Sequence, residues 1–159
     1  MPLWRNRWYT NDLPKVNTLC WMLVQGKILT AENLAKKGIQ GPSQCVLCKN
    51  DGETSGNVFQ ICPFSHSVWL HDLGKIGYTK VIPSTWEDMF TRWKCRYTRP
   101  LQTRSVLSWF WTGLTKYLCW QIWLIRNKAI FKNMYLSPAE VAKTTIALLS
   151  DALNAKEHI

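Results

Sequence analysis

Three cysteines constrain the fold of this chain more than any other feature of its sequence. Cys45 and Cys48 are separated by two residues, and Cys62 follows after thirteen intervening residues. Two thiolates at this spacing can hold one metal ion from a tight turn, and a third thiolate nearby is typical of a structural zinc site. The pattern therefore predicts a binding module and argues against an enzyme.

A tetrahedral zinc site needs a fourth ligand, and two side chains near Cys62 are candidates. His66 follows Cys62 by four residues, so on a helix both side chains would lie on one face. Asn57 precedes Cys62 by five residues, but a neutral amide is a poor zinc ligand. We expect at most one zinc ion per chain, with the ligand set Cys45, Cys48, Cys62 and His66. The alternative is that the cysteines are simply reduced, partly buried side chains.

The chain is strongly basic, with 20 Lys and Arg against 10 Asp and Glu. Between Met89 and Pro138 there are nine basic residues and no acid. Five of them form a dense run interleaved with aromatic residues: Arg92, Lys94, Arg96, Arg99 and Arg104. A basic field of this kind attracts polyanions, above all nucleic acid. The same charges would also fit an ordinary solvated surface, because basic composition sets only non-specific affinity.

Membrane insertion, secretion and catalysis are all disfavoured. Residues 106–125 are long and apolar enough to span a bilayer, but Lys116 at their centre would cost about 2.5–3.5 kcal/mol. The first residues lack the apolar core of a secretory signal, so we expect an intracellular protein of the nucleus or cytoplasm. The acidic residues do not cluster as catalytic metal ligands do, and no small-molecule substrate is expected.

Apolar spacing predicts helices over nearly the whole chain. Pro14 can open a first helix, and Thr30 is the expected N-cap of a second. Between residues 57 and 73 we expect two short helices broken near Pro63. The longest helix should run from about residue 102 to residue 132, with apolar residues on nearly every side, so more than one face should be covered. Ser84 and Ser137 each begin a capping box.

These elements predict a mostly α fold. A small helical module of the zinc-knuckle type would come first, followed by a long Trp-rich helix and a C-terminal amphipathic helix. We expect three parts: the zinc-binding module at residues 1–73, a linker with a loop and a short helix at 74–100, and a helical segment at 101–159.

Several short runs, taken together, resemble a known family. In the first 70 or so residues these are LPKV at 13–16, CWML at 20–23, GKILT at 26–30, LAKKG at 34–38, CVLC at 45–48, ET at 53–54, VFQICPFS at 58–65 and VW at 68–69. Their order and spacing resemble the zinc-binding domain that follows the reverse transcriptase in non-LTR retrotransposons, especially plant ones. Residues 120–131 resemble the helical segment that precedes the RNase-H-like domain of those polyproteins.

One departure from the family pattern concerns the metal. The family has a histidine before the last cysteine, and Asn57 stands in its place. The resemblance therefore carries over three ligands and leaves the fourth to His66, or implies that the site has decayed.

The resemblance implies a non-catalytic module that contacts RNA or DNA weakly and without sequence preference. Arg and Lys would contact phosphates, and Trp and Tyr would stack on bases. The alternative is a structural or protein-interaction remnant with a decayed zinc site. Its Trp-rich helix would once have packed on neighbouring domains and would now expose that surface.

Overall fold

The computed structural model describes residues 14–75, 86, 89 and 106–157. They form the helices α1 (Pro14–Val24), α2 (Ala31–Lys36), η1 (Asn57–Ile61), α3 (Pro63–Lys75), α5 (Val106–Lys132) and α6 (Pro138–Glu157). Within these ranges there is no strand, and Gln44 and Gly52 form an isolated antiparallel bridge. The predicted mostly α fold class is confirmed, including the long helix and the helix that follows it.

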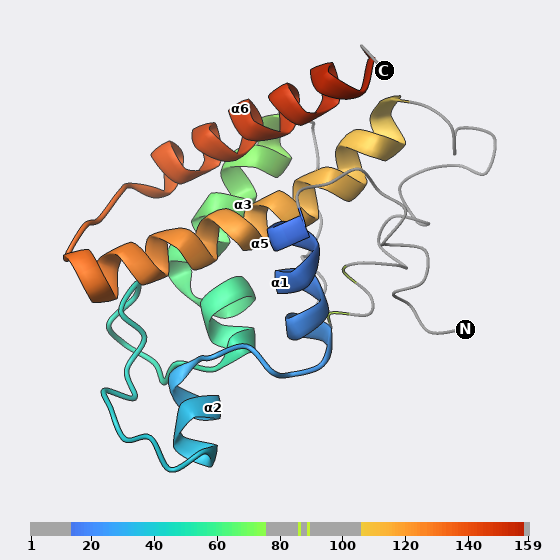
Figure 1. Cartoon of the computed structure of the whole chain (residues 1–159). Helices are drawn as coiled ribbons and strands as arrows, with labels where there is room; N and C mark the ends of the chain where they lie inside the picture. The colour runs from blue at the N-terminus through green and yellow to red at the C-terminus, as the bar shows by residue number, and fades with distance from the viewer. Residues whose placement is uncertain (1–13, 76–85, 87–88, 90–105, 158–159) are drawn as a thin grey trace.

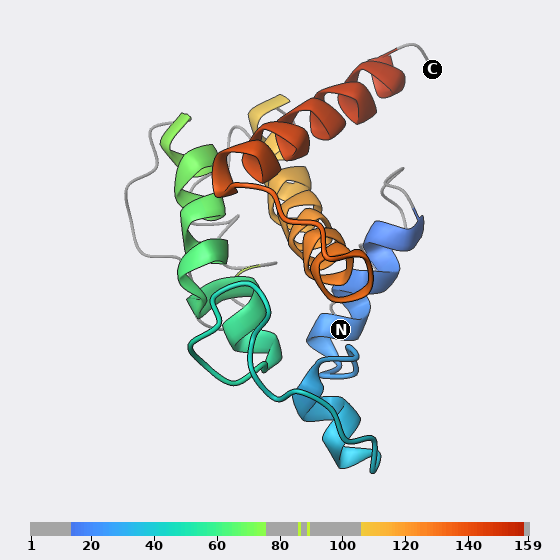
Figure 2. The ribbon, with the colours of Figure 1, turned by 90° about the vertical axis from the view of Figure 1, so that its left-hand side faces the viewer.

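Helix α5 is the central element, and it contacts α1, α3, η1 and α6. In Figure 1 helix α6 lies above the longer helix α5 and runs back along it, as the short connection at residues 133–137 requires. Figure 2 shows α5 between α3 on one side and α1 on the other. Packing on several sides confirms the prediction that more than one face of this helix is covered.

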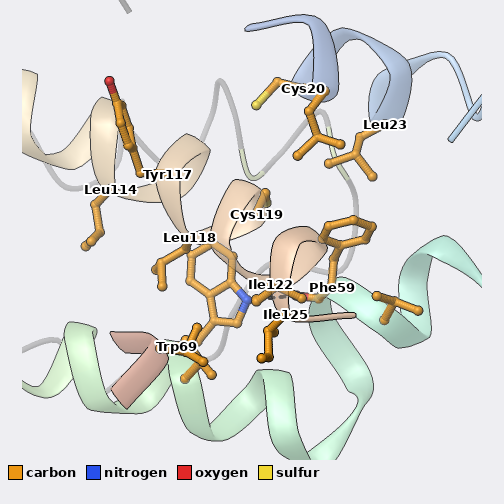
Figure 3. Close-up of a cluster of buried hydrophobic side chains, with 14 of the residues drawn as sticks. Cys20, Leu23, Phe59, Trp69, Leu114, Tyr117, Leu118, Cys119, Ile122 and Ile125 are labelled. Atoms are coloured by element: carbon orange, nitrogen blue, oxygen red, sulfur yellow. Dashed lines mark hydrogen bonds between the residues drawn. The ribbon is translucent and has the colours of Figure 1, made fainter. Parts of the chain in front are cut away.

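The hydrophobic core is built from the beginning, middle and end of the chain. Figure 3 shows α1, η1, α3 and α5 converging on it with the labelled residues Cys20, Leu23, Phe59, Trp69, Leu114, Tyr117, Leu118, Cys119, Ile122 and Ile125. Trp69 is fully buried, and its indole N–H donates to the carbonyl oxygen of Phe59 at 2.8 Å, which satisfies its polar atom. The Phe59 ring also stacks on Trp123 of α5, with ring centroids 5.9 Å apart.

The helix ends follow local sequence signals. Gly26 and Gly38 stand after α1 and α2 with φ of +64° and +77°, a backbone region that glycine enters without strain. At the start of α6, the Ser137 amide donates to the Glu140 carboxylate at 2.7 Å and the Glu140 amide donates to the Ser137 hydroxyl at 3.3 Å. The capping box at Ser137 is therefore confirmed, whereas Ser84 lies outside the described residues.

Lys116, at the middle of α5, is only 2% exposed, and its ammonium group donates to Asn17 Oδ1 of α1 at 3.1 Å. The lysine that argues against a bilayer span is thus part of the contact between two helices. Across the described ranges, no helix combines the length and the apolar composition needed to cross a membrane.

Asp72 gives the fold a specific pH dependence. This residue of α3 is fully buried, and Lys75 Nζ is 3.7 Å from its carboxylate. Burial, partly offset by Lys75, raises the pKa of Asp72 to about 7. The pKa of Asp72 in the folded chain is above its unfolded value of about 3.9, so the folded state favours the protonated carboxyl. Asp72 therefore lowers the stability of the fold least below pH 4, and the folded state loses this advantage as pH rises through 7.

We therefore expect Asp72→Asn to stabilise the protein at pH 8 by about 2–4 kcal/mol relative to its effect at pH 4. Urea unfolding of wild type and variant at the two pH values, both with EDTA so that no zinc is bound at either pH, measures this difference. Asp151→Asn, at an exposed position of α6, is the matched control and should show no such change. An Asp72→Asn effect that is equal at both pH values would contradict the prediction.

Candidate metal centre

The turn that carries Cys45 and Cys48 is closed by its own backbone. The Cys45 amide donates to the Asp51 carbonyl oxygen, and the Lys49 amide donates to the Cys45 carbonyl oxygen, both at 2.8 Å. Lys49 has a φ of +59°, in the left-handed region, which lets the chain reverse directly after the second cysteine. The two cysteines are thereby held on one tight loop.

Cys62 is positioned by an unusual helical turn. In the π-helical element η1, the Cys62 amide donates to the Asn57 carbonyl oxygen at 2.8 Å. Cys62 itself is extended, with φ of −48° and ψ of 127°, as expected for a residue before proline. Pro63 then begins α3, where its missing N–H costs nothing. The predicted break near Pro63 is confirmed, and it places Cys62 at the junction of two helices.

The three predicted cysteine sulfurs converge. All three Sγ atoms lie within 4.8 Å of one another, and those of Cys45 and Cys62 are 4.0 Å apart. A tetrahedral zinc ion with Zn–S bonds of about 2.3 Å separates its sulfur ligands by about 3.8 Å. Cys45 and Cys62 are fully buried and Cys48 is half-buried. The residues therefore fit a structural zinc site, and their predicted convergence is confirmed.

The thiols of Cys45 and Cys62 interact directly. The Cys45 thiol donates a hydrogen bond to the Cys62 sulfur, which with burial raises the pKa of Cys45. The same hydrogen bond lowers the pKa of Cys62. A zinc ion bound at this cluster would stabilise the thiolate form of its cysteines.

The fourth position is less defined than the other three. His66 lies in the first turn of α3, where its amide donates to the Cys62 carbonyl oxygen at 2.8 Å, but its side chain is exposed and stands outside the thiol cluster. Asn57 is buried, and its Oδ1 accepts no hydrogen bond from the described part of the chain. A buried oxygen of this kind is one that a cation or water would satisfy. His66 as the fourth ligand stays a prediction.

Comparison with protein families identifies this part of the chain. The family model described as zinc-binding in reverse transcriptase matches residues 1–69. Residues 1–69 therefore resemble a reverse-transcriptase zinc-binding domain. The match includes all three cysteines, and it is to the zinc-binding region and not to the catalytic domain of a reverse transcriptase. No curated protein and no solved structure has significant similarity to the chain.

A buried ion pair joins this zinc-binding domain to the C-terminal helices. Glu53 follows the cysteine turn, is only 3% exposed and receives two bonds from the guanidinium group of Arg126 on α5. One of them joins Arg126 Nε to Glu53 Oε2 at 3.1 Å. The guanidinium group also lies 4.7 Å from the centre of the Trp123 ring. The domain therefore depends on a helix that lies beyond the matched residues.

Glu53 also replaces an expected cap. Thr30 stands at the predicted N-cap position of α2, but its hydroxyl makes no capping hydrogen bond. Glu53 supplies the acceptors from outside the helix. Its carboxylate accepts from the Ala31 amide at 2.9 Å, and its carbonyl oxygen accepts from the Glu32 amide at 3.2 Å. Sequence reasoning missed this role because Ala31 and Glu53 are far apart in the chain.

The predicted basic surface is only partly described. Arg92, Lys94, Arg96, Arg99 and Arg104 lie outside the described residues. Two other basic residues of the same stretch, Lys116 and Arg126, are buried in contacts between elements, and this removes them from any phosphate-binding surface. Lys128 and Lys132, at the end of α5, are exposed.

Proposed function

We propose that the chain is a non-catalytic nucleic-acid-binding module derived from a retrotransposon polyprotein. The observation that carries the proposal is the convergence of Cys45, Cys48 and Cys62 inside a region that resembles a reverse-transcriptase zinc-binding domain. Zinc held by these thiolates, with His66 as the expected fourth ligand, would fix the cysteine turn to the start of α3. Its role would be structural, because thiolates from a closed set leave no position for a reacting water.

The proposed partner is RNA or DNA, bound weakly and without sequence preference, in the nucleus or cytoplasm. Exposed basic residues would contact phosphates, and aromatic residues would stack on bases. The chain carries a formal charge of +10, and a positive field of this size attracts a polyanionic partner such as nucleic acid.

The competing proposal is a protein-interaction remnant with a bare Trp-rich face on α5. Where the side chains of α5 are described, Trp120 and Trp123 are half-buried and pack against the core. Lys15 of α1 also covers the Trp120 ring, with its Nζ 5.3 Å from the ring centre. These contacts favour the nucleic-acid proposal, because these two tryptophans are already covered by the chain itself.

The test is the salt dependence of oligonucleotide binding. We expect the zinc-loaded protein to bind a fluorescent 20-nucleotide single strand, with an affinity that falls steeply between about 50 and 200 mM salt. Changing Arg92, Lys94, Arg96, Arg99 and Arg104 together to glutamine should lower the slope of log K against log salt by up to about 3.5. Fluorescence anisotropy measures both quantities, and affinity should fall equally for all sequences tested.

The control for this experiment is Lys143→Gln combined with Lys36→Gln, two exposed lysines on α6 and α2. These changes reduce the net charge without touching the basic run. If the five-fold variant and the wild type have equal affinities and slopes, the basic run is an ordinary solvated surface. The protein-interaction proposal would then replace the present one.

A further inference from the structure

The end of α5 and the connection to α6 expose an unusual amount of apolar surface. Phe131 is 77% exposed, and Met134 and Tyr135 are each 50% exposed. We refer to this surface as the α5–α6 corner; it comprises Phe131, Lys132, Asn133, Met134, Tyr135 and Leu136. Large side chains left in water at adjacent positions indicate a surface that meets a partner.

The α5–α6 corner has a defined backbone conformation. Asn133 has a φ of +50°, and the Met134 amide donates to the Lys128 carbonyl oxygen at 3.1 Å, so the chain leaves the helix by a hydrogen-bonded turn. The capping box of Ser137 and Glu140 then begins α6. The exposed rings are therefore presented from a fixed turn between two helices, and little ordering would be needed on binding.

The corner also lies beside the metal centre. The Nζ of Lys49, the residue directly after Cys48, is 5.3 Å from the centre of the Tyr135 ring. This contact joins the cysteine turn to the corner, although the two are more than 80 residues apart in sequence. Zinc that orders the cysteine turn would thus also order one side of the corner.

The charge around the corner is complementary to a phosphate backbone. Lys49, Lys128 and Lys132 are all exposed. The acids nearest in sequence are Glu140, whose carboxylate already accepts from Ser137, and Asp51, which is exposed in the cysteine turn. Basic side chains set around exposed rings are the combination by which proteins bind single strands. Phosphates follow the charges, and bases stack on the rings.

We propose that Phe131 and Tyr135 are a stacking platform for the bases of a single-stranded nucleic acid, with its phosphates along Lys49, Lys128 and Lys132. The inference rests on the nucleic-acid function proposed above and assigns it a surface in the described part of the chain. A single strand is required because the bases of a duplex are already stacked on each other and do not present their faces. A purely apolar protein partner would gain nothing from the three lysines.

The experiment uses the full zinc-loaded chain and a fluorescent oligo(dT) 20-mer. The double variant Phe131→Ala/Tyr135→Ala should bind roughly tenfold more weakly for each ring lost, with an unchanged salt slope. The double variant Lys128→Gln/Lys132→Gln should instead lower the salt slope by about 1.4. Because the changed side chains are exposed, both variants should keep the fold, which circular dichroism and zinc content verify.

Trp21→Ala is the matched control. Trp21 of α1 is also a partly exposed ring, 36% accessible, with the Nζ of Lys27 5.7 Å from its centre. It has the same pairing of ring and lysine but lies outside the corner, so its loss should leave affinity unchanged. An equal loss of affinity in this control would show a general effect of aromatic content and would overturn the assignment.

The outcomes separate this inference from the broader function. If the wild type binds no oligonucleotide, the proposed function fails. If the wild type binds but the Phe131→Ala/Tyr135→Ala variant binds equally well, only the assigned surface is wrong. Binding of a 20-base-pair duplex as tightly as the single strand, with the same dependence on the two rings, would also overturn the stacking platform.

Discussion

Removing zinc should unfold the cysteine turn and destabilise the whole chain by several kcal/mol. The free energy of zinc binding to small thiolate sites is about 10–16 kcal/mol and is coupled to folding, but here part of the core can persist without it. The thiolates of the fully buried Cys45 and Cys62 would then lose the cation that balances their charge. Cys62→Ser should have the same effect as a chelator, because it removes a fully buried ligand.

The measurement is thermal unfolding of the purified chain with zinc or with EDTA, together with elemental analysis. We expect one zinc ion per chain in the wild type and none in Cys62→Ser. Cys119→Ala is the control: Cys119 is also fully buried, but it lies in the core beside Cys20 and outside the thiol cluster, so zinc content should be unchanged. Absence of zinc from the wild type, with no effect of EDTA on Tm, would show that the site has decayed.

The same zinc titration identifies the fourth ligand. Loss of affinity in His66→Ala but not in Asn57→Ala would confirm His66, and the opposite result would identify the buried Asn57 oxygen. Asn57→His, which restores the residue of the family pattern, should raise the zinc affinity because imidazole is the better ligand. A gain of at least about tenfold is expected, since even groups that only orient a ligand contribute that much.

The features that were predictable from sequence are local ones. The spacing of Cys45, Cys48 and Cys62 predicts their convergence because a tight turn and a helix start allow few geometries. The capping box at Ser137 and the break at Pro63 were equally predictable, since a cap and a missing N–H act within a few residues.

What sequence could not predict depends on pairs that are distant in the chain. In the sequence Arg126 is one of nine basic residues in a stretch without acids, and only the fold shows it buried against Glu53, 73 positions earlier. For the same reason Thr30 was expected to cap α2, whereas a carboxylate from another loop performs that role. The exposure of Phe131 likewise depends on which elements pack against α5, and apolar spacing alone does not identify them.

The ion pair of Arg126 and Glu53 should be the strongest single link between the zinc-binding domain and the helices that follow it. Arg126→Ala is expected to destabilise the protein by about 3–5 kcal/mol, because it leaves the Glu53 carboxylate buried and without its counter-ion. It also removes the cation that stacks on Trp123. Lys128→Ala, at an exposed position two residues later, is the control and should change stability by less than about 0.5 kcal/mol.

A double-mutant cycle separates the pair from the cost of an unpaired charge. Glu53→Gln alone should also be costly, because its carboxylate holds both Arg126 and the Ala31 amide at the start of α2. Arg126→Ala/Glu53→Gln, measured by urea unfolding at constant zinc, should be less destabilised than the sum of Arg126→Ala and Glu53→Gln by about 1–3 kcal/mol. The reason is that no charge then remains buried without a partner. Strict additivity would mean that the two side chains act independently, and that the contact between α5 and the zinc-binding domain is maintained by apolar packing around Phe59 and Trp123 instead.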